Sequence, residues 1–318
     1  FEDISNKHSG LRNFLTEIIA CRFEKSRYTA HRTVGKYFVH RKLGKGGWGQ
    51  VYYATHKTLG MPAAIKMMKH DMAMEPLFPE SFRKEAVIIA QLNHANIVQV
   101  YDIEELYRTV FIIMEYLEGE PLDANLERLG RIPVPRVVNF LKQLLEGLGY
   151  AHELGVVHRD IKPANIFIQS SPRDHLKILD FGLACSLGAE DMALAGTVHY
   201  AAPEQIDGLP VDGRTDLYAL GIMTYELLIG HRPYPENDLI KMLDLHLSQE
   251  IPDPAAAAPD LPEELRTFII RCCRIDPRER FQTCAEALAH LRGLFARHDM
   301  PSGARRNMTA LHLLYKDE

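Results

Sequence analysis

Several features that would indicate a special class of protein are missing from this sequence. The 318 residues include only five cysteines, an odd number with no Cys-x-x-Cys pair, which argues against a disulfide framework and against a zinc site. No run approaches 18 uninterrupted apolar residues, so no membrane segment is predicted in this piece. The net charge of −5 offers no basic surface, so nucleic acid is not an expected partner.

The composition is that of an ordinary globular protein. Hydrophobic residues make up 46% of the chain and charged residues 25%, enough to bury a sizeable core. The sparse cysteines favour a reducing, cytoplasmic location. Because the chain opens with Phe1 and shows no signal-peptide pattern, we expect it to be a piece excised from a longer protein.

The first 36 residues are predicted to be a helix followed by a polar linker. Apolar residues recur there at helical spacing between Leu11 and Phe23. Two interpretations remain open. The helix closes an upstream sensory domain, with some similarity to the end of a cyclic-nucleotide-binding domain, or it simply caps the domain that follows.

From residue 37 onward the pattern predicts an α+β protein with a small antiparallel sheet before a larger helical part. The sheet is expected from three strand-like runs, over residues 37–43, 51–55 and 63–68. A helix is expected over residues 80–92, and helical patterns dominate after Gly119, interrupted by short strands at 166–168 and 177–179. The polar stretch after residue 296 is interpreted as a linker.

The glycine-rich segment of residues 44–49 is predicted to join two strands. Gly-x-Gly-x-x-Gly alone is weak evidence, because it also occurs in dinucleotide-binding folds. There a helix begins within the motif, whereas Gln50 to Thr55 alternates like a strand. Gly44, Gly46 and Gly49 would let backbone amides approach phosphate oxygens, with Trp48 over the site.

A lysine and a glutamate are predicted to form a pair. Lys66 ends an apolar strand, and Glu85 lies on the apolar face of the helix expected over residues 80–92. A strand-end lysine alone is usually just solvated. Because an unpaired buried carboxylate is costly, Glu85 needs a cation, and Lys66 is the candidate.

The most specific signals come later in the chain. His158-Arg159-Asp160 is followed by Lys162 and Asn165, and Asp180-Phe181-Gly182 follows a short strand. With Gly196 to Glu204, these motifs resemble the eukaryotic-type (Hanks-type) serine/threonine protein kinase family over roughly residues 37–295, and its bacterial members in particular.

The resemblance implies a two-lobed kinase fold, with a β-sheet N-lobe carrying one helix (residues 37–117) and a mainly helical C-lobe (118–295). It implies transfer of the ATP γ-phosphate to serine or threonine hydroxyls of protein substrates, within a larger signalling protein. Five residues would act in catalysis: Asp160 orients or deprotonates the hydroxyl, Lys162 neutralises charge on the γ-phosphate, Thr197 contacts both, and Lys66 is oriented by Glu85.

The resemblance also implies ATP and Mg²⁺, with Mn²⁺ as an alternative. Asn165 and Asp180 would hold the metal. The backbone groups of Glu115 and Leu117, in the segment after Met114 that joins the lobes, would bind adenine. The residues expected to contact ATP are Leu43, Gly44, Lys45, Gly46, Gly47, Trp48, Gly49, Val51, Ala64, Lys66, Met114, Glu115 and Leu117.

Two further acidic residues are expected to have structural roles. The resemblance pairs Glu204 with Arg280. It also implies that Asp216 fixes the backbone of the catalytic loop, residues 158–165. An Asp before a helix is more simply an N-cap, and both roles could coexist.

Two rival functions are kept. A nucleotide-gated scaffold without catalysis has no chemical need for Lys66, Glu85, Asp160, Asn165 and Asp180 together. A phosphotransferase acting on small molecules is disfavoured by residues 197–204, which resemble the family's segment for docking a peptide substrate. Ser186 is the only hydroxyl residue between Leu183 and Gly196, while Glu190 and Asp191 supply negative charge, so we hypothesise that activation does not require phosphorylation there.

Overall fold

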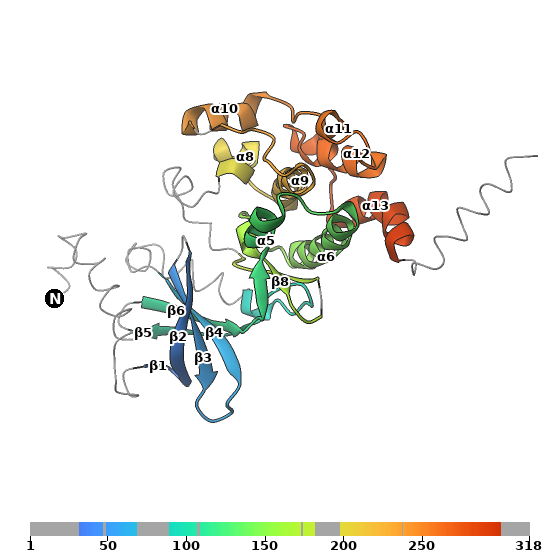
Figure 1. Cartoon of the computed structure of the whole chain (residues 1–318). Coiled ribbons are helices and arrows are strands. Elements are labelled where there is room, and N and C mark those ends of the chain that lie inside the picture. Colours follow the sequence, from blue (N-terminus) through green and yellow to red (C-terminus); the bar gives the residue numbers. More distant parts are fainter. Residues whose placement is uncertain are drawn as a thin grey trace, which may run out of the picture.

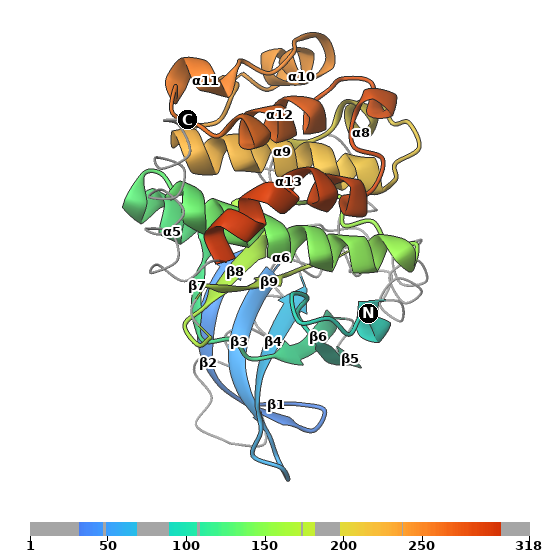
Figure 2. The ribbon, with the colours of Figure 1, turned by 90° about the vertical axis from the view of Figure 1, so that its right-hand side faces the viewer.

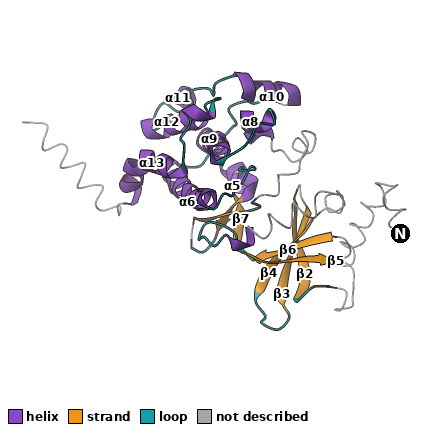
Figure 3. Ribbon diagram, turned by 180° about the vertical axis from the view of Figure 1, so that it is seen from behind, coloured by secondary structure: helices purple, strands orange, loops and turns teal. Residues whose placement is uncertain are grey.

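A computed structural model of the chain describes residues 32–46, 49–68, 89–106, 109–172, 174–181, 198–236 and 238–299 (Figure 1). A strand-rich lobe lies at one end and a helical lobe at the other, so the two-lobed α+β prediction is confirmed (Figure 3). Residues 1–31 of the helix and linker expected over 1–36, most of the helix expected over 80–92, and the tail from residue 300 lie outside the described residues. Two expected bounds were wrong: Thr33–Val34 of the expected linker forms strand β1 by pairing with the next strand, and the last helix, Cys284–Asp299, continues past residue 295.

The N-lobe is a six-stranded antiparallel sheet in the order β1-β2-β3-β4-β6-β5. The three strands predicted from the sequence are present as β2, β3 and β4, and each is longer than predicted. The bounds are β1 Thr33–Val34, β2 Tyr37–Gly46, β3 Gly49–His56, β4 Pro62–Met68, β5 Val100–Leu106 and β6 Thr109–Glu115.

Alternation along these strands gives the sheet an apolar cluster on each face. In β4, Ala63 and Ile65 belong to one cluster, and Ala64 belongs to the other. The second cluster also contains Met114 and receives Leu179 from the chain just before Asp180. Period-two alternation thus places Ala64 on the face of the sheet that looks toward the C-lobe.

The C-lobe is built on helices, which Figure 2 shows stacked above the sheet. Helix α6 begins at Val134, with Pro135 in its first turn, where a missing N–H costs nothing. The bounds are α5 Leu122–Leu129, α6 Val134–Glu153, α8 Pro203–Ile206, α9 Gly213–Ile229, α10 Leu239–Ser248, α11 Pro254–Ala257, α12 Glu263–Cys272 and α13 Cys284–Asp299.

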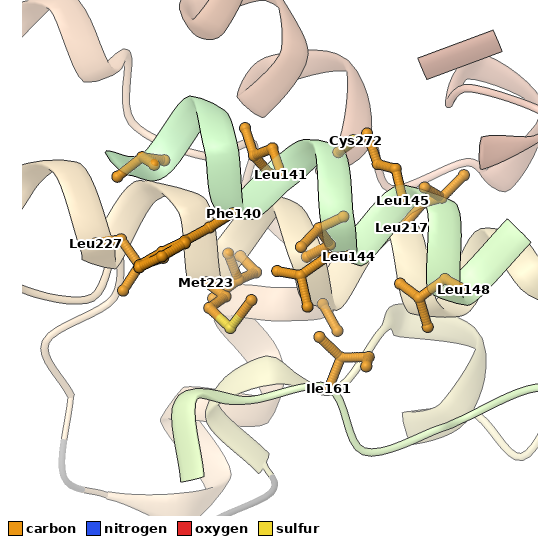
Figure 4. Packing of buried hydrophobic residues seen from close by; sticks show 14 of the residues in the cluster. Phe140, Leu141, Leu144, Leu145, Leu148, Ile161, Leu217, Met223, Leu227 and Cys272 are labelled. Atoms are coloured by element: carbon orange, nitrogen blue, oxygen red, sulfur yellow. The ribbon is translucent and has the colours of Figure 1, made fainter. Parts of the chain in front are cut away.

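Helices α6 and α9 form the centre of the C-lobe core. Figure 4 shows the apolar face of α6, including Leu144 and Leu148, packed against Met223 of α9 and Ile161 of the catalytic loop. Almost every residue of α9 is buried, as expected for a helix that is apolar all round. A Cβ at Gly221 would lie 2.6 Å from Cys273 Sγ, so this glycine permits the close approach of α9 to the end of α12.

A small three-stranded sheet carries the catalytic segments. Its strands are β7 Gly119–Pro121, β8 Ile166–Gln169 and β9 His175–Ile178, in the order β7-β8-β9. Strand β8 begins directly after Asn165, and β9 ends two residues before Asp180. The amide of Ile178 donates to the Asn96 carbonyl (2.8 Å), and the amide of Val98 donates to the Ile178 carbonyl (3.0 Å), which ties this sheet to the chain entering β5.

Among the helices of the described residues, none is both long enough and apolar enough to cross a membrane.

Candidate active site

The glycine-rich segment lies in the β2–β3 hairpin, as predicted, and not at a strand-to-helix turn. Gly44 pairs with Val51 and Gly46 with Gly49 in antiparallel register. Within the described part of the chain, and leaving aside the two neighbouring residues, no heavy atom lies within 4 Å of the position that a Cβ of Gly44 would occupy. Gly47, Trp48 and the side chain of Lys45 lie outside the described residues. The hairpin therefore offers open backbone near its tip, which suits a phosphate group.

Lys66 contacts a different carboxylate from the one predicted. It pairs with Val51 on β3 and with Ile112 on β6 in the sheet, and its side chain is buried. Its Nζ lies 2.6 Å from Oδ2 of Asp180. Glu85 lies outside the described residues, so the Lys66 to Glu85 pair stays a prediction. The observed ion pair brings together the two groups that were expected to contact phosphate and metal.

Apolar side chains line the sheet next to Lys66. Ala64 and Met114 are buried there, and Val51 and Leu117 pack against them half-buried. Leu43, also predicted to contact ATP, is 39% exposed. This surface suits a flat, largely apolar ring such as adenine.

The segment joining the lobes is fixed by Glu115. Its amide donates to the Gln99 carbonyl at 2.9 Å, and its Oε1 accepts from the Gln99 amide at 2.8 Å. The same Oε1 lies 2.7 Å from Nζ of Lys177 on β9. The amide of Glu115 is therefore used within the protein. Lys177 was not foreseen, because a lysine on a short strand gives no signal of its partner.

Asp160 lies at the centre of a buried polar cluster. Its Oδ2 is 2.9 Å from Nζ of Lys162 and accepts a 2.9 Å hydrogen bond from Nδ2 of Asn165. Asn165 also donates to the Asp160 carbonyl at 2.7 Å. Because Nδ2 of Asn165 is used twice toward Asp160, its side-chain oxygen is the group left for a cation. Thr197, the fourth member expected here, lies outside the described residues.

Asp180 is held close to this cluster by its neighbours. The amide of Leu179 donates to the Asn165 carbonyl at 2.8 Å, and the Leu179 carbonyl lies 2.7 Å from Nε2 of His158. The ring of Phe181, 2% exposed, lies 4.6 Å from the ring of His158, centroid to centroid. The catalytic loop and the Asp-Phe-Gly segment are therefore packed as one unit.

Asp216 anchors the backbone of the catalytic loop. It is fully buried in the first turn of α9 and accepts from the amides of His158 (2.9 Å) and Arg159 (2.8 Å). Arg159 has a φ of +68° and Asp180 a φ of +59°, which non-glycine residues rarely adopt. The N-cap of α9 is Asp212, so the N-cap interpretation of Asp216 is wrong, and the tie to the catalytic loop is confirmed.

A histidine missed in the sequence completes this anchor. Nε2 of His152, on α6, lies 2.7 Å from Oδ2 of Asp216. Burial is the largest single influence and would lower the pKa of His152, but the hydrogen bonds and charges of Asp216 and Cys284 together outweigh it and raise that pKa to about 10. Burial likewise opposes ionisation of Asp216, yet the His152 hydrogen bond and the loop amides hold its pKa below the usual value. His152 gives little signal in the sequence, because a histidine near a helix end is common.

The predicted ion pair between Glu204 and Arg280 is confirmed. Nη1 of Arg280 donates to Oε1 of Glu204 and Nη2 donates to Oε2, each at 2.8 Å, and Arg280 is fully buried. Thr215 also donates to Glu204, at 2.7 Å. The pair fixes the segment after Val198 to the base of the C-lobe.

Comparison with known proteins agrees with this geometry. Residues 37–291 match the family described as the protein kinase domain. The chain is 33% identical over 268 residues to the serine/threonine-protein kinase PrkC of Bacillus subtilis, covering 83% of this chain and 41% of PrkC. It is 35% identical over 270 residues to the serine/threonine-protein kinase PknA of Mycobacterium tuberculosis, covering 81% of this chain and 62% of PknA.

A solved structure shows the same fold. The Mycobacterium tuberculosis PknI kinase domain superposes with a TM-score of 0.67 at 29% identity, covering 82% of this chain and 97% of that domain. The similarity to PrkC and PknA extends over less than two thirds of each relative. The chain therefore belongs to the eukaryotic-type (Hanks-type) serine/threonine protein kinase family.

Proposed function

We propose that this chain is the catalytic module that transfers the γ-phosphate of ATP to serine or threonine hydroxyls of protein substrates. The observation that carries the proposal is the buried cluster of Asp160, Lys162 and Asn165 beside the Lys66 to Asp180 ion pair. Positioning and charge stabilisation are the main needs of phosphoryl transfer, and these five side chains supply both.

Each side chain has a proposed role. The Asp160 carboxylate accepts a hydrogen bond from the substrate hydroxyl and orients its oxygen toward the γ-phosphate. Lys162, held 2.9 Å from Asp160, offsets negative charge on the transferred group. Lys66 contacts the α and β phosphates, oriented by Glu85, and Thr197 contacts Asp160 and Lys162.

ATP would lie between the β2–β3 hairpin and the joining segment. The glycine-rich residues 44–49 would cover the phosphates, and Leu43, Val51, Ala64 and Met114 would contact the base. The carbonyl of Glu115 and the amide of Leu117 would bind its polar edge. The open space at Gly44 and the apolar sheet surface support this placement.

Asn165 and Asp180 would hold the divalent cation, for which we propose Mg²⁺, with Mn²⁺ as an alternative. One carboxylate and one amide oxygen suit a hard cation that keeps water and phosphate oxygens as its other ligands. When bound, the cation neutralises phosphate charge.

The surroundings of the module are also proposed. We propose that the N-lobe extends from β1 to residue 117 and the C-lobe from residue 118 to the end of α13, that a linker follows α13, and that an upstream sensory domain ends in a helix within residues 1–31. If deleting residues 1–30 from the full-length protein leaves its regulation unchanged, the sensory link fails. We propose a cytoplasmic location, which is supported by the free buried thiols Cys272, Cys273 and Cys284.

The central test is phosphate transfer from γ-labelled ATP with Mg²⁺ to the protein itself and to a generic Ser/Thr substrate, comparing wild type with Asp160→Asn. We expect transfer by wild type and a loss of at least about 10²-fold in the variant. ATP binding without transfer by wild type would overturn the proposal in favour of a nucleotide-gated scaffold. Transfer to an alcohol or amine metabolite but to no peptide would indicate a small-molecule phosphotransferase.

A further inference from the structure

A hollow of about 600 Å³ opens at one side of the C-lobe. Its walls are the connection from α5 to α6, the last turn of α9 and the connection from α11 to α12. Figure 2 shows α5 and α11 on the same side of this lobe. No residue proposed above to act in catalysis, to bind ATP or to hold the cation lines the hollow. It is therefore a surface separate from the candidate active site.

The wall of this hollow is mainly apolar. Nine of its eleven lining residues have apolar side chains. Ile132, Leu228 and Leu261 are buried, whereas Leu129, at the end of α5, is 43% exposed. An exposed leucine beside an apolar hollow is typical of a surface that an apolar partner covers.

The other two lining residues carry opposite charges on opposite walls. Arg131 lies on the connection from α5 to α6, and Asp260 lies on the connection from α11 to α12. Both are exposed, and neither forms an ion pair with another described residue. A partner that is apolar in the middle and carries one charge of each sign at its ends would therefore complement this surface.

The chain that follows α13 leaves the domain next to this hollow. A Cβ on Gly149, near the end of α6, would lie 3.3 Å from the Cβ of Cys284 at the start of α13. Helix α13 therefore runs back along α6 toward the wall of the hollow (Figure 2). Near its end, Arg297 forms an ion pair with Glu264 in the first turn of α12, three residues after Leu261.

The sequence after α13 has the complementary pattern. Residues 300–307 separate α13 from an apolar run over residues 308–315, and eight residues can span up to about 26 Å. In a helix, Met308, Leu311 and Tyr315 would share one face. Two arginines precede the run, at 305 and 306, and two acidic residues follow it, at 317 and 318.

From this arrangement we propose that residues 308–315 of the same chain dock in the hollow as a short amphipathic helix. The apolar face of the segment covers Leu129, in the helix-in-groove mode of peptide recognition. Arg305 and Arg306 lie beside Asp260, because the chain approaches from the start of α12. The acidic residues at 317 and 318 then reach Arg131 on the opposite wall.

The test is hydrogen–deuterium exchange of the 318-residue protein, read by mass spectrometry. We expect the amides of residues 308–315 to exchange at least about tenfold more slowly than in a free peptide of the same sequence. Leu129→Asp should return them to the rate of the free peptide, because it places a charge against the apolar face of the segment. Leu311→Asp should do the same, and should also speed exchange in residues 129–134.

A matched control places the same charge elsewhere. Leu154, at the end of α6, is also exposed but does not line the hollow, so Leu154→Asp should keep the slow exchange. Thermal unfolding of each variant checks that it is folded.

A charge reversal tests the proposed orientation. Asp260→Arg should speed exchange of residues 308–315 by about a few-fold, as expected for partly exposed ion pairs. Combining it with Arg305→Asp and Arg306→Asp should restore slow exchange.

Three results would overturn the inference. The first is exchange of residues 308–315 at the free-peptide rate in wild type. The second is slow exchange that Leu129→Asp leaves unchanged, which would place the segment on another surface. The third is slow exchange only at protein concentrations where light scattering reports a dimer, which would show that the hollow holds the segment of a second copy.

Discussion

The imidazole Nε2 of His152 lies 2.7 Å from Oδ2 of Asp216, the same oxygen that accepts the His158 amide. Helix α6, helix α9 and the catalytic loop therefore meet at a single carboxylate. Asp216 and Cys284 together raise the pKa of His152 to about 10 against the effect of burial, so the pair of His152 and Asp216 is ionic at neutral pH. A buried ion pair of this kind ties the position of Asp160 to the packing of the helical core.

The raised pKa of His152 predicts a pH dependence of stability. Because the folded-state pKa lies above the unfolded value, the contribution is fully present below about pH 6.5 and is lost as the pH rises through about 10. Over that window the free energy of unfolding should fall by up to about 1.4 kcal/mol per pH unit from this group. The free energy of unfolding, measured with denaturant from pH 6 to 10, should fall less steeply with pH in His152→Gln than in wild type. An equally steep fall in both proteins would contradict the ionic pair.

Asp216→Asn should reduce catalysis more than it reduces ATP binding. The amide group would present a donor toward the loop amides or toward His152, so the loop backbone would shift while the ATP surface on the N-lobe stays. We expect a loss of about 10²-fold in kcat and little change in the Kd for ATP.

Asp212→Ala is the matched control for Asp216→Asn. Asp212 is the N-cap of the same helix, and its side chain accepts from the Arg214 amide. Its loss should cost about 1 kcal/mol of stability with little effect on kcat. Equal kcat losses in the two variants would indicate a general effect of α9.

Arg280→Met should be strongly destabilising. It leaves Glu204 buried with its charge unpaired, and it also removes hydrogen bonds to the carbonyls of Arg274, Ile275 and Arg214. We expect a loss of about 3–5 kcal/mol in the free energy of unfolding, measured with denaturant. Arg278→Met breaks the ion pair to Asp276, in which the arginine is 85% exposed, and should have a much smaller effect on stability because water screens the pair. Similar losses in both variants would sink the assignment of Glu204 and Arg280 as a structural pair.

Asp180→Asn should raise the Mg²⁺ concentration needed for half-maximal activity, by at least about tenfold, because it removes the one carboxylate proposed as a ligand. Asp174→Asn is the control. Asp174 has the same φ of +59° and a similar side-chain exposure, but pairs with Arg136 in the turn between β8 and β9. Unchanged Mg²⁺ titrations in both variants would rule out Asp180 as the metal ligand.

Phosphatase treatment should leave the activity intact. Residues 183–196 contain a single hydroxyl side chain, Ser186, and the acidic residues Glu190 and Asp191. Protein phosphorylated on this loop and then treated with phosphatase should keep most of its transfer rate in the labelled-ATP assay. Abolition of activity by the phosphatase would show that loop phosphorylation is required.

Local patterns in the sequence predicted most of the elements. Alternation around the glycines predicted β2 and β3. The pair of Glu204 and Arg280 was predicted from the family resemblance, because each residue lies in a motif of the family. Other elements have weaker local signals. Closely spaced prolines usually favour loops, yet Pro254–Ala257 forms a short helix, because Asp253 caps it and proline suits its first position.

The sequence by itself determined the family, the two-lobed fold and the identity of the polar residues, because each depends on short motifs and local periodicity. Only the tertiary structure decided which groups meet. The pairing of Lys66 with Asp180, the contact of His152 with Asp216, and the link from Glu115 to Lys177 join segments 62 to 114 positions apart. Such partners depend on how separate elements pack, and a charged residue on one helix or strand carries no local signal of the residue that will neutralise it.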